Sequence, residues 1–329
     1  MNVLLILTVS RGSKAFRGTL LVRFSLRDGP HARVTRLLTT AVQVDNRWVR
    51  APRAEELWAA GCLQAALPGV VVGHHDRNLG AQHDFDLSHA GDVTFGAVEV
   101  TAAADSAYVE LWKIVDGNMP WQDSGLAGGW KVYVRPGRKA RNIKSLRAKL
   151  PPALQALEHA GRTVLHRHAP AGDLLHEAMQ DLGVTWAYQA PTDFPGSIYV
   201  MPDLPADRAS TFMADTGDAL AAWIDAVMAD PDQAHNLRKL AASAAPEKHL
   251  FLLVPAIVTT APMPVTDVLM RGITPTRPPT LPAAVTHLWV TSDWRAGNGF
   301  RWDPTDGWLA FANDTTPLPV DQLAGCACS

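Results

Sequence analysis

Three carboxylates that lie close together in the sequence could bind a divalent cation. Asp84 and Asp86 come shortly before Glu99, which interrupts the otherwise apolar and β-branched run 93–101. Such a run is typical of a buried strand. An unpaired carboxylate on a buried strand costs several kcal/mol, so we expect Glu99 to have a cation, a hydrogen-bond donor or a raised pKa.

Turn residues at 88–92 connect the segment of Asp84 and Asp86 to the run that carries Glu99 and predict a hairpin. Because side chains alternate between the faces of a strand, Asp84 and Asp86 share one face of the first strand. The hairpin is therefore expected to bring an aspartate beside Glu99. Carboxylates on adjacent strands are the ligands that a hard cation such as Mg²⁺ or Mn²⁺ prefers. We predict that Asp86 and Glu99 bind the metal and that Asp84 assists.

This arrangement resembles the core of the PD-(D/E)XK nucleases, which have the restriction-endonuclease-like fold. In that family a helix that carries an acid precedes a hairpin whose first strand ends near an Asp and whose second strand carries Glu-x-Lys. Here 54–63 is the expected helix with Glu56 as its acid, 70–73 the opening strand, and Glu99 the motif acid. The resemblance covers residues 53–115 and implies a Mg²⁺- or Mn²⁺-dependent nuclease that acts on DNA or RNA, with Glu56 as a ligand through water.

One position departs from the family pattern, because Thr101 stands where the family has lysine. Threonine cannot stabilise the charge that develops on a phosphate as an ammonium can. Lys113 or Lys239, each on an expected helix, could supply the missing cation to the catalytic site. Without it, the protein would be an inactive nuclease-like module that binds nucleic acid or takes part in defence. A third alternative is a protein-interaction domain in which Glu99 pairs with an arginine.

The segment 131–149 carries many basic residues and no acid, although the whole chain has a net charge of −2. Attraction to nucleic acid would therefore be local rather than a property of the whole molecule. Phosphate groups could offset this cluster of like charge. The predicted nucleic-acid contacts are Arg135, Arg138, Lys139, Arg141 and Lys144. A solvated basic turn that pairs with nearby acids is the alternative.

The order of expected helices and strands predicts an α/β fold, with a restriction-endonuclease-like mixed central sheet flanked by helices and an inserted basic α/β segment. An apolar strand at 249–254 would follow the helix of Lys239 and complete the core sheet. The expected divisions are a basic N-terminal extension, the acidic-motif half of the core, the basic insertion, the rest of the core and a tail, at 1–40, 41–116, 117–217, 218–312 and 313–329.

Other catalytic chemistries have weaker support in the sequence. His74, His75 and His83 lie near aspartates, so a His/Asp hydrolase with a transition metal is an alternative, but adjacent His74 and His75 would point apart on a strand. The sequence has no Gly-x-Ser-x-Gly elbow, and Cys62 is expected to be a core residue of the first helix. No glycine-rich phosphate loop of Walker or Rossmann spacing indicates a nucleotide cofactor.

The cellular compartment can be predicted from the cysteines and the apolar segments. Three cysteines cannot build a disulfide framework, which suits a reducing cytosol. The apolar stretch 3–9 is too short to cross a bilayer and lacks the flanking features of a signal peptide. We therefore expect a cytoplasmic protein that does not contact the membrane.

Overall fold

The hairpin expected around Asp86 and Glu99 is present in the computed structural model. Strand β6 (Phe85–His89) pairs antiparallel with β7 (Gly96–Ala102), and β5 (Val70–His74) pairs antiparallel with β6 on its other side. The structure describes residues 2–7, 20–25, 41–44, 47–50, 52–75, 82–90, 93–115, 120–135, 145–168, 170, 172–190, 194–209, 215–255, 258–293, 298–319 and 323–325.

The chain divides into two compact units, and each contains a mixed sheet with helices, so the predicted α/β class is confirmed. Unit 1 comprises Met1–Ala102, Ala214–Leu253 and Pro264–Ser329, and unit 2 comprises Ala103–Met213 and Val254–Met263. Unit 2 contains most of the expected insertion 117–217. It begins earlier in the chain than that insertion and therefore includes α2 (Ser106–Val115).

Unit 1 is built on an eight-stranded sheet with the order β16-β15-β14-β13-β7-β6-β5-β17. The expected apolar strand is β13 (Glu247–Val254), which pairs parallel with β7. The other strands of this sheet are β14 (His287–Ser292), β15 (Gly299–Asp303), β16 (Gly307–Phe311) and β17 (Ala324–Gly325). Two further hairpins pair β1 (Asn2–Leu7) with β2 (Leu20–Ser25), and β3 (Ala41–Val44) with β4 (Arg47–Arg50).

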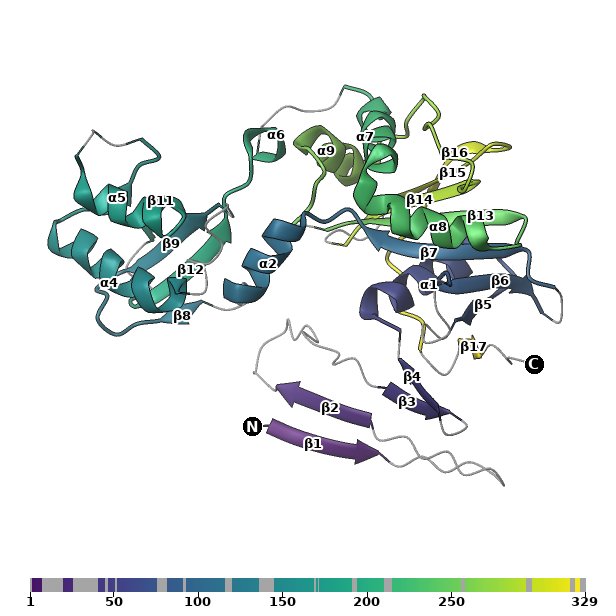
Figure 1. Ribbon diagram of the computed structural model, residues 1–329, viewed down its shortest axis with the longest axis horizontal. Coiled ribbons are helices and arrows are strands. Elements are labelled where there is room, and N and C mark those ends of the chain that lie inside the picture. The colour runs from purple at the N-terminus through teal and green to yellow at the C-terminus, as the bar shows by residue number, and fades with distance from the viewer. Residues whose placement is uncertain are drawn as a thin grey trace. The chain divides into compact units, whose positions relative to one another are not determined.

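Two helices contact β7 from different sides (Figure 1). Helix α1 (Ala54–Ala66) buries Leu57, Ala60 and Leu63 as expected, and packs them in one core with Val98 and Val100. Helix α8 (Ala234–Ala242) contacts β7 through residues that meet Glu99 and Thr101. Since Glu99 and Thr101 alternate with the two valines, α1 and α8 cover opposite faces of the strand. The remaining elements of unit 1 are α7 (Asp218–Ala229), η2 (Pro231–Gln233) and α9 (Met263–Arg271).

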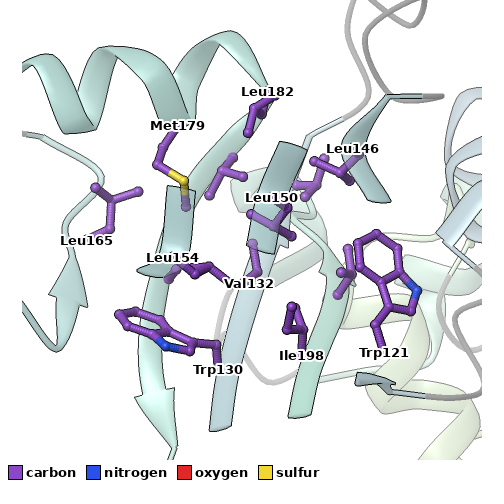
Figure 2. Close-up of a cluster of buried hydrophobic side chains, with 14 of the residues drawn as sticks. Trp121, Trp130, Val132, Leu146, Leu150, Leu154, Leu165, Met179, Leu182 and Ile198 are labelled. Atoms are coloured by element: carbon purple, nitrogen blue, oxygen red, sulfur yellow. The ribbon is translucent and has the colours of Figure 1, made fainter. Parts of the chain in front are cut away.

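Unit 2 contains a five-stranded sheet with the order β10-β11-β9-β12-β8. Its strands are β8 (Trp121–Gln122), β9 (Gly129–Val134), β10 (Val164–Leu165), β11 (Val184–Ala190) and β12 (Ser197–Pro202). Its helices, besides α2, are α4 (Leu146–His159), α5 (Leu174–Asp181) and α6 (Ala206–Ala209). Four leucines of α4 are fully buried and pack against Trp130, Val132 and Ile198 of the sheet (Figure 2): Leu146, Leu150, Leu154 and Leu157.

No helix in the described part of the chain is long and apolar enough to cross a membrane.

Candidate active site

Glu99 lies in the middle of β7 and is almost completely buried, with 2% of its surface exposed. Its Oε1 is 2.6 Å from Nζ of Lys239, which extends from α8. The cation expected beside this buried carboxylate is therefore a lysine from a distant helix. Lys113, the other candidate, lies on α2 in unit 2.

A second contact fixes α8 on this face of β7. One turn before Lys239, the side-chain amide of Asn236 donates a hydrogen bond to Oγ1 of Thr101 at 3.0 Å. Residues three apart lie on the same side of a helix, and residues two apart lie on the same face of a strand. Asn236 can therefore contact Thr101 while Lys239 contacts Glu99. The ammonium group that is missing at position 101 is thus supplied by Lys239 from α8.

Asp84 is tied to the backbone on both sides of Glu99. Its N–H donates to the carbonyl of Val98 at 2.9 Å, and its Oδ2 accepts from the N–H of Val100 at 2.8 Å. The carboxyl group is fully buried. Asp84 thus stabilises the hairpin next to Glu99, where the sequence predicted an aspartate, and holds β7 in position.

Asp86, predicted to share a metal with Glu99, instead lies between two histidines. Nε2 of His83 is 2.7 Å from one carboxylate oxygen, and Nε2 of His75 is 2.7 Å from the other. Burial alone would raise the pKa of Asp86, but hydrogen bonds from His75 and His83 outweigh it and hold that pKa well below its ordinary value. Asp86 is therefore an anion between two imidazoles.

The donor atoms of His75, His83 and Asp86 all lie within 4.8 Å of one another, close enough to bind one ion. Among the described residues, Asp86 forms such a group with these histidines and not with Glu99. Two imidazole nitrogens and a carboxylate suit Mn²⁺, Fe²⁺ or Zn²⁺, whereas Mg²⁺ prefers oxygen ligands alone. Sequence reasoning undervalued this set because His74 and His75 are adjacent. In the structure His74 packs edge-on against Phe85, so only His75 joins the cluster.

The histidine–aspartate cluster and the lysine line the same cavity. This cavity has a volume of about 450 Å³, and its wall includes His75, His83, Asp86 and Lys239. A cation-binding cluster and an ammonium group that face one space are suited to an anionic substrate such as a phosphate.

Glu56, expected to reach the metal through water, is engaged elsewhere. It is buried at the start of α1, where it accepts a hydrogen bond from the backbone N–H of Arg53 at 2.8 Å and pairs with that arginine's side chain. This is the reciprocal hydrogen bonding of a helix N-terminus. Because α1 covers the face of β7 opposite Glu99, Glu56 stabilises the helix in the structure.

The predicted nucleic-acid contacts are only partly described. Arg135 lies in unit 2, at the end of β9, and pairs with the buried Asp203 at 2.8 Å. The other four, Arg138, Lys139, Arg141 and Lys144, lie outside the described residues.

A second group of two histidines and an acid was missed in the sequence. Glu247 and His249 share a face of β13, and His287 lies on the neighbouring β14. Their donor atoms also lie within 4.8 Å of one another, beside a cavity of about 400 Å³. The available signal was His249, a buried polar residue in an apolar strand, as Glu99 is in β7.

Comparisons of the chain with family models, with curated proteins and with solved structures found no match.

Proposed function

We propose that this protein is a metal-dependent nuclease that hydrolyses phosphodiester bonds of DNA or RNA. The observation that carries the proposal is the shared cavity: the ammonium of Lys239, paired with Glu99, faces the same space as His75, His83 and Asp86. A metal ion and a cation of this kind can both offset the charge that develops on a phosphodiester during hydrolysis.

The order of elements in unit 1 supports a restriction-endonuclease-like core. Helix α1, the antiparallel strands β5, β6 and β7, then α8 and the parallel β13 follow the order that the family resemblance implies. Thr101 occupies the lysine position of the family motif. Lys239 compensates for this change, because it reaches Glu99 from α8.

The residues divide the work in this proposal. His75, His83 and Asp86 would hold a divalent cation, which supplies an acidified water as the nucleophile and offsets charge on the phosphate. Lys239, which lines the same cavity, would stabilise the developing charge. Glu99 orients the ammonium of Lys239, and Asp84 holds the strand that carries Glu99. The donor set favours Mn²⁺ over Mg²⁺.

A second function, an inactive module that binds nucleic acid, is favoured by the deep burial of Glu99 and by the hydrogen bond that occupies Thr101. In that case Lys239 and Glu99 are a structural ion pair. The two functions differ in whether phosphodiester bonds are cut.

The test is cleavage of end-labelled single-stranded and duplex DNA and RNA with Mn²⁺, with Mg²⁺ or with EDTA. We expect cleavage with Mn²⁺, none with EDTA, and a loss of about 100- to 1000-fold in Lys239→Met and in Asp86→Asn. The matched controls are Lys248→Met, which changes a half-buried lysine of β13, and Glu247→Gln, which changes the acid of the second cluster. Both should retain activity.

Absence of cleavage by the wild type with every metal would contradict the nuclease. Salt-sensitive binding without cleavage would then identify the inactive module. Equal activity of wild type and Lys239→Met would show that the lysine has no catalytic role.

A further inference from the structure

The sheet of unit 2 has two faces of different character. On β9, Trp130, Val132 and Val134 are fully buried in the core with α4 and α5 (Figure 2). The alternate residues Lys131 and Tyr133 lie on the opposite face and are partly exposed. One face therefore builds the core, and the other carries polar and aromatic side chains that the core does not use.

Three aromatic rings stack on this second face. The ring of Tyr133 lies 3.9 Å from that of Trp186 on the neighbouring β11, and their planes differ by 10°. Tyr188 continues the series 5.5 Å from Trp186. The register of the strands causes this ladder, because Trp186 pairs with Tyr133 and Tyr188 pairs with Lys131. All three rings are partly exposed.

Cations lie beside two of the three rings. Nζ of Lys131 is 5.6 Å from the centre of the Tyr133 ring, and a hydrogen bond with Tyr133 raises the pKa of this lysine. The guanidinium of Arg167 lies 5.8 Å from the Trp186 ring. Arg167 and Arg135 both pair with Asp203 and line a cavity of about 530 Å³.

The carboxylate of Asp203 does not neutralise both of its arginine partners. Two guanidinium groups share the single buried carboxylate of Asp203, and the side chains of Arg135 and Arg167 are 50% and 46% exposed. Each arginine contacts Asp203 through Nη2 and also lines the cavity, so its other donors are not used by Asp203.

We propose that this face binds single-stranded nucleic acid, with bases stacked on Tyr133, Trp186 and Tyr188 and phosphates against Lys131, Arg135 and Arg167. Bases of a duplex are stacked inside it, whereas unpaired bases can stack on aromatic rings. Cations beside stacked rings can pair with the phosphates that join stacked bases, whereas a neutral sugar carries no charge for them to pair with. The inference deepens the proposed nuclease, since it names its substrate as single-stranded, and it rests on that proposal only for the cutting step.

The experiment measures binding of fluorescein-labelled single-stranded and duplex oligonucleotides to the full chain in EDTA, by anisotropy. We expect single strands to bind more tightly than duplexes. Trp186→Leu and Tyr188→Leu should each weaken binding by about 10- to 100-fold. Arg167→Gln should lower the slope of log affinity against log salt by about 0.7.

The matched control is Phe194→Leu, which removes an exposed ring of unit 2 outside the ladder and should leave affinity unchanged. Circular dichroism of each variant checks that unit 2 is folded. Equal binding of duplex and single strand, wild-type affinity in both ring variants, or no binding of either nucleic acid would overturn the proposal.

The two proposals can fail separately. Single-strand binding that depends on the ladder, in a protein that never cuts, would sustain this inference and reject the nuclease. Cutting that survives loss of the ladder with unchanged affinity would sustain the nuclease and reject this inference.

Discussion

In its described residues, unit 1 contains two clusters of two histidines and one acid, but the ring geometry of the two clusters differs. The rings of His75 and His83 are nearly perpendicular, at 76°, and the Nε2 of each lies 2.7 Å from Asp86. Ligands about 2.1 Å from a tetrahedral metal ion lie roughly 3.4 Å apart, so a bound ion would replace the two Nε2 protons that Asp86 accepts, and the ligands would move only a short distance.

In the second cluster the rings of His249 and His287 are stacked, 4.3 Å apart and 20° from parallel. The lone pair of an imidazole nitrogen lies in the ring plane, so two stacked rings cannot direct both lone pairs at one ion. In addition, Nδ1 of His249 accepts a hydrogen bond from the indole of Trp289 at 3.2 Å. The neutral ring then carries its proton on Nε2, which faces Glu247 at 3.0 Å.

The comparison shows that residue types and short distances do not define a metal site. What decides is the direction of the lone pairs and the bond made by the other ring nitrogen. We infer that the first cluster binds a transition metal and that the second is a hydrogen-bonded network that stabilises β13 and β14.

The largest expected effect is the loss of stability when the cation beside each cluster is replaced. Lys239→Met should lower the free energy of unfolding by about 3 kcal/mol, because it leaves Glu99 buried without its cation. Arg301→Met, which changes the cation beside the second cluster, should cost about 1 kcal/mol or less, because Arg301 is 3.9 Å from the exposed Asp306. Urea unfolding measures both.

Adding Glu99→Gln to Lys239→Met should recover most of the lost stability without restoring cleavage. If Lys239→Met and Arg301→Met cost the same, the lysine would be an ordinary surface charge.

The next largest effect is on metal affinity, which distinguishes the two clusters. Asp86→Asn should weaken Mn²⁺ binding by at least about 100-fold, since it removes a ligand, whereas Glu247→Gln should leave the affinity unchanged. Calorimetric titration of both variants and the wild type gives the affinities. The reverse result would assign the metal to the second cluster.

Trp289→Phe separates the two reasons for which the second cluster fails as a metal site. The substitution should cost about 1 kcal/mol for the lost hydrogen bond to His249. Because the rings stay stacked, the protein should still bind one Mn²⁺ ion, as counted by metal analysis after dialysis. A second bound ion would show that the tautomer, and not the ring orientation, excluded the metal.

The smallest effect is a difference in the pH at which each cluster loses stability. Burial lowers the pKa of His287, so the unfolded chain binds more protons, and stability falls as pH drops below about 6.5. The lowered pKa of Asp86 acts only below about pH 4, where the unfolded carboxyl is protonated.

Denaturation between pH 7.5 and 5.5 should therefore cost the wild type more than His287→Asn. Between pH 5 and 3 it should cost the wild type more than Asp86→Asn. Identical pH dependence of either variant and wild type would contradict the role of that group.

Local patterns predicted the elements better than they predicted the site. The helix at 54–63 and the hairpin are confirmed, because periodicity and turn residues act over a few positions. The partners of Asp86 depend on the course of the chain between His75 and His83, which periodicity does not describe. The position of Lys239 against Glu99 depends on how α8 packs on β7, a contact across a long stretch of sequence.

The unit boundary shows the same limit. The helix after β7 was expected in the nuclease-like core, but α2 belongs to unit 2, where Leu111 and Val115 join the core of the five-stranded sheet. An amphipathic pattern shows that a helix has an apolar face and does not specify which sheet covers it.

The most direct test of the account is diffraction from crystals grown with Mn²⁺, recorded where manganese scatters anomalously. We predict one strong peak within bonding distance of His75 Nε2, His83 Nε2 and the Asp86 carboxylate, in the cavity that Lys239 lines. A peak between Glu247 and His287, or one at Asp84 and Glu99 without the histidines, would contradict it.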